Sequence, residues 1–148
     1  LSGGVYELGT VDGRFCAATD KALCFVKADG SVSTYDYQGA NLARCSINGG
    51  KFAAVLLENY SSGGLTHLAT VNTAGEEIAA LTVDSQVLDL SAAGRYVAVL
   101  YTSSLVIYDR NLRQCAVLED VNFARRVLMR SDGSAVLAGT NFASLYLP

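Results

Sequence analysis

Apolar residues recur along this chain in short runs separated by polar or Gly-containing turns. Four segments repeat one order, an apolar run, a turn with Gly, then a second apolar run: VYELGTVDGRFCAA, LARCSINGGKFAAV, VLDLSAAGRYVAVL and VLMRSDGSAVLAG. The turn glycines are Gly13, Gly50, Gly94 and Gly133, spaced by 37, 44 and 39 residues. Runs of this length that are rich in Val, Tyr, Phe and Thr are typical of β-strands. The pattern therefore predicts a repeated all-β unit.

The second half of each unit also repeats, as a strand, a polar turn and another strand. The segments are LCFVKADGSVSTYD, THLATVNTAGEEIAALTVD and LVIYDRNLRQCAVLED. Four short antiparallel strands that recur about every forty residues are the signature of a β-propeller blade. We predict a single all-β domain over residues 1–148, with blades at approximately 5–37, 42–84, 87–120 and 124–148.

Two stretches, Glu76–Leu90 and Asn111–Arg130, also place some apolar residues at helical spacing. Taken alone, either could form a helix. Their register with the other repeats favours strands.

The last predicted blade is incomplete. The 15 residues after Gly133 suffice for a second and a third strand but not a fourth, and only four residues precede Val5. An open row of blades leaves apolar faces at both ends. We therefore expect the chain to belong to a larger or oligomeric ring, either with N-terminal blades missing from this sequence or as a homodimer of eight blades.

Composition narrows the function classes. The chain is 51% hydrophobic and has a formal net charge of -3, which argues against intrinsic disorder and against nucleic-acid binding. No apolar run is long enough for a membrane-spanning helix. A single His and four Cys without a CxxC spacing predict no metal site, and we predict no cofactor.

The cysteines leave two alternatives open. Buried free thiols are one interpretation, because each Cys lies within an apolar stretch. If residues 14–18 and 22–25 form a hairpin with Cys16 opposite Cys24, these two could instead form a cross-strand disulfide in an oxidising compartment. Opposed thiols could equally pack side by side.

Charged residues in the first strand of each blade would line the central channel. Aligning these strands places Arg44 opposite Asp89 of the next blade, which predicts an ion pair that joins the two blades. With Arg126 or Arg125 added, the same residues could form a channel site for an anionic ligand. His67, the only His, is interpreted as a strand residue near a loop, since no GxSxG context supports a catalytic triad.

One rim of the predicted propeller carries the loops in which a partner would bind. The longest, residues 58–64, lengthens the second unit and contains an aromatic residue, although a tolerated insertion explains it equally well. The candidate rim residues are Tyr37, Gln38, Asn59, Tyr60, Ser61 and Asn122.

The repeats resemble bacterial WD40-like and quinoprotein-like β-propellers, including an uncharacterised membrane-anchored family. The segment VLDLSAAGRYVAVLYTSSLVIYDRNL carries this likeness most clearly. The sequence has no Trp and no Gly-His dipeptide, and Tyr108-Asp109 stands where a Trp-Asp dipeptide would be. The resemblance implies an extracytoplasmic location, with an anchor upstream of Leu1, and argues against a quinone cofactor.

Together these observations predict a non-enzymatic interaction or sensor module that offers its rim to a protein, peptide or glycan. The alternatives are a propeller hydrolase or lyase with a site at the channel mouth, and a purely structural spacer.

Overall fold

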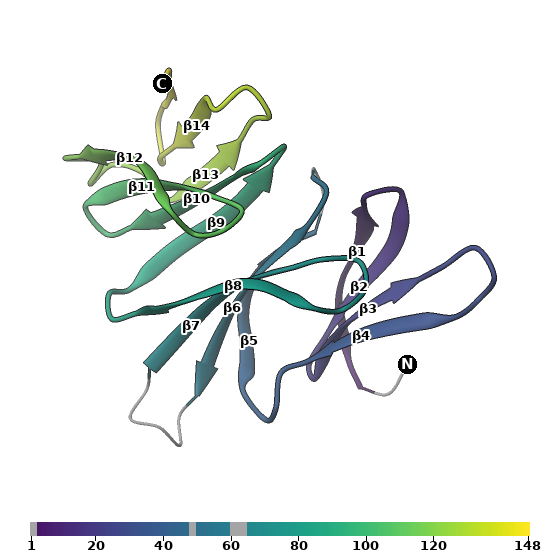
Figure 1. The fold of residues 1–148 in the computed structure, drawn as a ribbon. Coiled ribbons are helices and arrows are strands. Elements are labelled where there is room, and N and C mark those ends of the chain that lie inside the picture. Colours follow the sequence, from purple (N-terminus) through teal and green to yellow (C-terminus); the bar gives the residue numbers. More distant parts are fainter. Residues whose placement is uncertain (1–2, 48–49, 60–64) are drawn as a thin grey trace.

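The computed structural model describes residues 3–47, 50–59 and 65–148, and these form fifteen strands in four antiparallel sheets (Figure 1). Within each sheet the strands follow one another in sequence order, so every connection is a hairpin. The stretches with helical spacing are strands as well. None of the described residues belongs to a helix that could cross a membrane. The all-β class and the shortened last sheet are as the sequence predicts.

The first three sheets have four strands each, and the last has three. Blade one contains β1 (Val5–Val11), β2 (Arg14–Thr19), β3 (Ala22–Val26) and β4 (Val32–Asp36). Blade two contains β5 (Asn41–Ser46), β6 (Ala53–Asn59), β7 (Leu65–Val71) and β8 (Glu77–Val83). Blade three contains β9 (Val87–Ala93), β10 (Tyr96–Tyr101), β11 (Ser104–Asp109) and β12 (Gln114–Glu119). Blade four contains β13 (Arg126–Met129), β14 (Ala135–Ala138) and β15 (Ala143–Tyr146).

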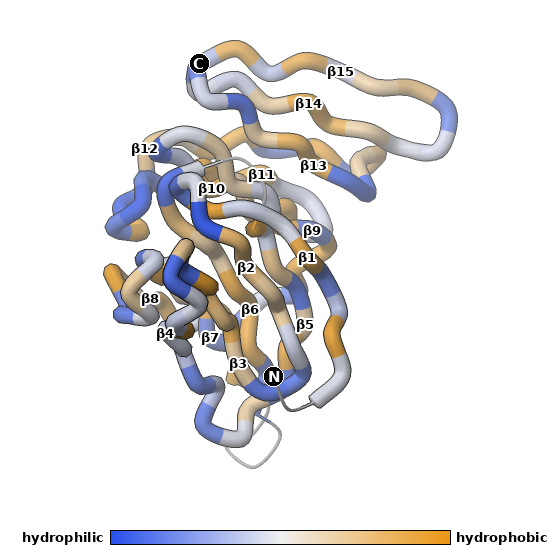
Figure 2. Tube along the Cα trace, turned by 90° about the vertical axis from the view of Figure 1, so that its right-hand side faces the viewer, coloured by the Kyte–Doolittle hydropathy of each residue, from blue (hydrophilic) through white to orange (hydrophobic). Residues whose placement is uncertain are grey.

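The first strands of all four blades lie along one side of the molecule, and the fourth strands lie along the other (Figure 2). The turns after the first strands touch each other from blade to blade. The Asp12 backbone N–H donates to the Gly50 carbonyl oxygen at 3.1 Å, and Gly50 forms a bridge with Gly94. Asp12 and Gly13 have φ of +47° and +73°, as the two central residues of a tight hairpin turn require. This arrangement is the inner, channel side of a propeller.

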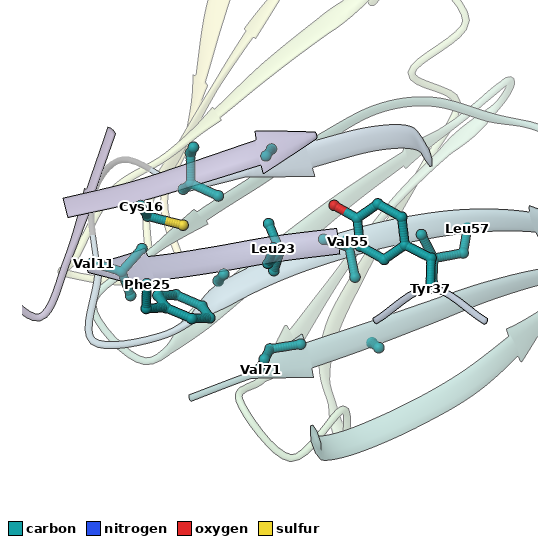
Figure 3. Close-up of a cluster of buried hydrophobic side chains, with 12 residues drawn as sticks. Val11, Cys16, Leu23, Phe25, Tyr37, Val55, Leu57 and Val71 are labelled. Atoms are coloured by element: carbon teal, nitrogen blue, oxygen red, sulfur yellow. The ribbon is translucent and has the colours of Figure 1, made fainter. Parts of the chain in front are cut away.

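Apolar side chains fill the three junctions between successive blades. In the first three blades most residues of the second and third strands are buried, which explains why these strands read as continuous apolar runs. In the junction of blades one and two, Phe25, Leu23 and Val55 are fully buried (Figure 3). Because each junction needs a face from both blades, no blade buries its core alone.

The cysteine pairing considered from the sequence does not form. In the β2–β3 hairpin Cys16 pairs with Phe25 and Ala17 pairs with Cys24, one residue away from the assumed register. A shift of one residue places the two thiols on opposite faces of the sheet. Cys16 lies in the junction with blade two and Cys24 on the far face, and all four cysteines are free. Cys115 is exposed, which corrects the expectation that each Cys is buried.

Candidate functional site

On the channel side, a β-bulge precedes a charged residue in three of the four first strands. The register shifts directly before Glu7 in β1, before Arg44 in β5 and before Asp89 in β9. A bulge bends the strand and redirects the side chain that follows. In blade four Arg126, the first residue of β13, is paired with Ala138 in the matching position. Each blade thus contributes one charged side chain, and the signs alternate along the row.

Each of the first three charged residues reaches forward to the next blade. The Cys45 thiol donates to Oε2 of Glu7 at 3.1 Å, and Nε of Arg44 donates to the Leu88 carbonyl oxygen at 3.4 Å. Burial, reinforced by the bond to Glu7, raises the pKa of the Cys45 thiol, which therefore stays protonated as a donor. The sequence alone did not single out Glu7 as a channel residue. Its position could have indicated it, because Glu7 lies six residues before Gly13, as Arg44 lies six residues before Gly50.

Asp89 joins blades three and four. Its Oδ2 accepts a hydrogen bond from the Val127 backbone N–H at 2.9 Å, and its Oδ1 lies 3.7 Å from Nη1 of Arg126. The predicted Arg44–Asp89 ion pair is wrong. Both side chains point forward along the row, so Arg44 meets the backbone of β9 while Asp89 turns to blade four. Arg126 is 76% exposed, so its ion pair with Asp89 contributes little to stability, and the bond to Val127 contributes more.

Two serines repeat the same forward contact. Oγ of Ser46 accepts from the Ala92 backbone N–H, and Oγ of Ser91 accepts from the Met129 backbone N–H, both at 2.9 Å. These N–H groups lie on the inner edge strand of the following blade, where no further strand can pair with them. A serine hydroxyl from the preceding blade satisfies them instead.

The four charged residues line a channel-side hollow of about 850 Å³. Glu7 and Asp89 balance Arg44 and Arg126, so the hollow has no surplus of positive charge for an anionic ligand. Arg125 does not join them, because its Nη1 donates to the carbonyl oxygens of Asn122 and Ala124 at 2.7 and 2.8 Å. In the described part of the chain, no three His, Cys, Asp or Glu side chains gather as a metal site requires. The contacts on this side hold blades together.

A second hollow, of about 640 Å³, lies on the rim between blades one and two. The turn after β4 brings Gln38 to it, at a φ of +53°, and Oδ1 of Asp36 accepts from the Gln38 backbone N–H at 2.6 Å. Such local Asp bonds stabilise tight turns. This hollow is called the rim hollow below, and the residues that line it include Tyr35, Gln38, Asn59, Leu65, His67 and Glu77.

A polar contact crosses the two blades inside the rim hollow. The Tyr35 hydroxyl of β4 donates to Oε2 of Glu77 in β8 at 2.7 Å, and Nε2 of His67 lies 3.5 Å from the same oxygen. Burial, followed by the bond to Glu77, raises the pKa of the Tyr35 phenol, which stays protonated as a donor. Glu77 and His67 keep 40% and 45% of their side chains exposed, so both can meet a ligand.

The structure brings three of the predicted rim residues together and places a fourth elsewhere. Tyr37, Gln38 and Asn59 all line the rim hollow. Tyr37 is only 3% exposed and its ring points into the junction of blades one and two, so it borders the rim hollow from within the core (Figure 3). Asn122 lies in the turn between β12 and β13, away from this hollow. Tyr60 and Ser61 lie outside the described residues.

The sequence matches no family model and no curated protein. Three solved structures are similar in fold. The computationally designed Ika4 protein aligns with a TM-score of 0.66 and 8% identity over 99% of this chain and 92% of its own. BBS1N, in complex with ARL6DN, aligns with a TM-score of 0.64 and 11% identity over 95% of this chain and 49% of its own. AztD from Citrobacter koseri aligns with a TM-score of 0.63 and 14% identity over 86% of this chain and 38% of its own.

At these identities the likeness establishes the fold alone. The chain spans about half of BBS1N and less than half of AztD. Both are β-propeller-like, as is Hsv2 of Kluyveromyces lactis, of which this chain covers 42%. The chain therefore has a β-propeller-like fold of four blades, the last with three strands.

Proposed function

We propose that this chain is a non-enzymatic recognition module that holds a basic peptide segment of a partner protein in the rim hollow. The observation that carries the proposal is the exposed Glu77 carboxylate between Tyr35 and His67, where blades one and two meet. Asp36 also lines this hollow, so its acidic residues outnumber the single His. A Lys or Arg side chain would gain charge-assisted hydrogen bonds there.

The size and the lining of the rim hollow suit a peptide. Its volume of about 640 Å³ falls within the range of pockets that enclose small ligands, and Leu65 adds an exposed apolar surface beside the acids. The fold is consistent with this role, since one similar structure, BBS1N, is a complex with ARL6DN. A bacterial, extracytoplasmic setting, taken from the sequence resemblance, remains a prediction of the same proposal.

The test measures the binding of fluorescein-labelled octapeptides that differ only in charge, rich in Lys and Arg or rich in Glu, by fluorescence polarisation. We expect the basic peptides to bind and the acidic ones not to bind, with an affinity that falls as salt is added. Glu77→Gln keeps an acceptor for the Tyr35 hydroxyl but removes the charge, and we expect it to weaken binding about tenfold, equivalent to about 1.4 kcal/mol.

The neighbouring Glu76 provides the matched control. Its Oε2 accepts from Nδ2 of Asn72 within the β7–β8 turn, and it does not line the rim hollow. Glu76→Gln removes the same charge from the same part of blade two and should leave binding unchanged. Equal losses from the two variants, or equal binding of basic and acidic peptides, would contradict the proposal.

A further inference from the structure

Both end blades expose an apolar face of the kind that the middle blades bury. On the free face of blade one, Leu8, Phe15 and Val32 are 56%, 43% and 52% exposed. On the free face of blade four, Leu128 and Leu145 are 62% and 51% exposed. Both side chains lie on the same face of the sheet, because Leu128 pairs with Val136 and Val136 pairs with Leu145.

The free face of blade one has the pattern of a blade junction. Leu8 follows the charged residue Glu7 and pairs with Ala17, just as Leu90 follows Asp89 and pairs with Val99. Leu90 packs against the preceding blade and is only 6% exposed. Leu8 therefore occupies the position of a residue that contacts a preceding blade.

The second strand repeats the observation. Two residues before Ala17 lies Phe15, which occupies the position that Val97 has in blade three and Ala135 has in blade four. Val97 and Ala135 are fully buried against the preceding blade, whereas Phe15 is 43% exposed. The face is thus built for contact with the forward face of another blade.

The free face of blade four is the forward face of the same kind of junction. Arg126 occupies the place of Asp89, and Leu128 occupies the place of Ser91, two residues further along the strand. Asp89 and Ser91 both bond the backbone of the following blade, and Ser91 is 8% exposed. Leu128, at 62% exposure, is the matching side chain without a covering blade.

Charge complementarity selects the partner. The charged residues on the first strands of the four blades alternate in sign: negative at Glu7, positive at Arg44, negative at Asp89 and positive at Arg126. A blade that follows blade four should therefore carry a negative residue at this position of its first strand. Blade one supplies one, Glu7. We propose that two copies of this chain form a closed ring of eight blades, in which each fourth blade packs its forward face on the other copy's first blade. The alternation of charge then continues around the whole channel.

This closure extends an interface that the chain already forms three times. The joint is heterologous, so two copies related by a two-fold axis along the channel make two identical joints and leave no end face open. The inference uses the end faces and does not depend on the proposed role of the rim hollow.

The mass in solution is the first test. Sedimentation equilibrium should give twice the chain mass of 15.6 kDa. Leu8→Asp and Leu128→Asp, one on each face, should each shift the protein to monomer. Val117→Asp is the control, because Val117 is 41% exposed on β12, a strand of an internal blade. A wild-type chain that stays monomeric, or that gives three copies, would overturn the two-copy ring. So would a dimer that survives both Asp substitutions on the end faces.

A charge exchange identifies the partner as a second copy. Glu7→Arg places two positive side chains at each joint, and Arg126→Glu places two negative ones there, so each variant alone should be monomeric. Mixed in equal amounts, they should form a heterodimer, because each joint then holds one Arg and one Glu. Circular dichroism of each variant checks that it is folded. Failure of two folded variants to associate on mixing would refute the pairing of Glu7 with Arg126.

Discussion

The turn between β7 and β8 presses against blade one, and a single methyl group tests this contact. Gly75 has a φ of +80°, and a Cβ there would lie 2.5 Å from the Thr34 carbonyl oxygen and 2.8 Å from the Thr34 carbonyl carbon. These are backbone atoms of β4, so they have no rotamer that would relieve the overlap. Gly75→Ala therefore forces blade one and the turn apart.

Blade one offers a matched control at the corresponding turn. Gly30 has nearly the same φ, +82°, but a Cβ there meets no atom within 4 Å. A left-handed backbone costs an Ala about 1–2 kcal/mol at either position. Overpacking at a closed site adds about 1–3 kcal/mol. We therefore expect Gly30→Ala to lower the free energy of unfolding by about 1–2 kcal/mol, and Gly75→Ala by about 2–5 kcal/mol.

Urea unfolding followed by far-ultraviolet circular dichroism measures both values, at one fixed protein concentration because association also stabilises a fold. A domain of this kind typically has about 5–15 kcal/mol of stability, so both variants should remain folded without denaturant. Equal losses from Gly30→Ala and Gly75→Ala would refute the reasoning, since left-handed strain alone would then account for both. That result would mean that the β7–β8 turn of blade two does not lie against the backbone of blade one.

Two further predictions concern the junctions between blades. Ser91→Ala leaves the buried Met129 N–H without an acceptor and should lower the free energy of unfolding in urea by about 1–3 kcal/mol. The control Ser85→Ala, on an exposed loop, should change the same free energy by less than about 0.5 kcal/mol. Equal losses would contradict the role of the Ser91 hydroxyl. Burial raises the pKa of the Cys16 thiol from 9.0 to about 12, so between these pH values the folded state keeps a proton that the unfolded chain releases. The contribution of this thiol to the free energy of unfolding is therefore fully present below pH 9 and is lost as the pH rises to 12. Cys16→Ala should make this alkaline decline shallower, and an unchanged pH profile would contradict the assignment.

The channel-side contacts and the rim hollow assign different tasks to the two sides of this chain. On the channel side, charged and hydroxyl groups bond the following blade, Glu7 at the Cys45 thiol and the others at the backbone, so they specify how blades follow one another. On the rim, the Glu77 carboxylate is exposed and bonds side chains that are themselves partly exposed. This division explains why the Asp89 carboxylate is engaged within the fold while Glu77 remains available to a ligand.

Most of the architecture was predictable from local pattern. The alternation of apolar runs with Gly-containing turns predicts an all-β fold of four-stranded units with an incomplete last unit, and the structure agrees with both. The physical reason is that hairpins are local: a turn such as Asp12-Gly13 and the runs beside it determine which strands pair. Gln38 and Asn59 were predicted at the rim on the same basis, and both line the rim hollow.

Long-range geometry lay beyond the sequence. A single-residue shift in the β2–β3 hairpin moved Cys24 to the face opposite Cys16, and no apolar pattern specifies a register when both faces are buried. Arg44 and Asp89 lie on the first strands of their blades, each directly after a bulge and directed to the following blade, and Asp89 contacts Arg126 rather than Arg44. Tyr37 lies in the loop after β4, yet its ring fills a junction core.

The sequence by itself therefore determined the unit that repeats, because strands and tight turns are specified by neighbouring residues. Only the tertiary structure decided which side chains meet across two blades, because those contacts join residues some forty positions apart and depend on bulges and registers that shift by a single residue. The cluster of Tyr35, His67 and Glu77, and the row of alternating charges from Glu7 to Arg126, both arise at this second level.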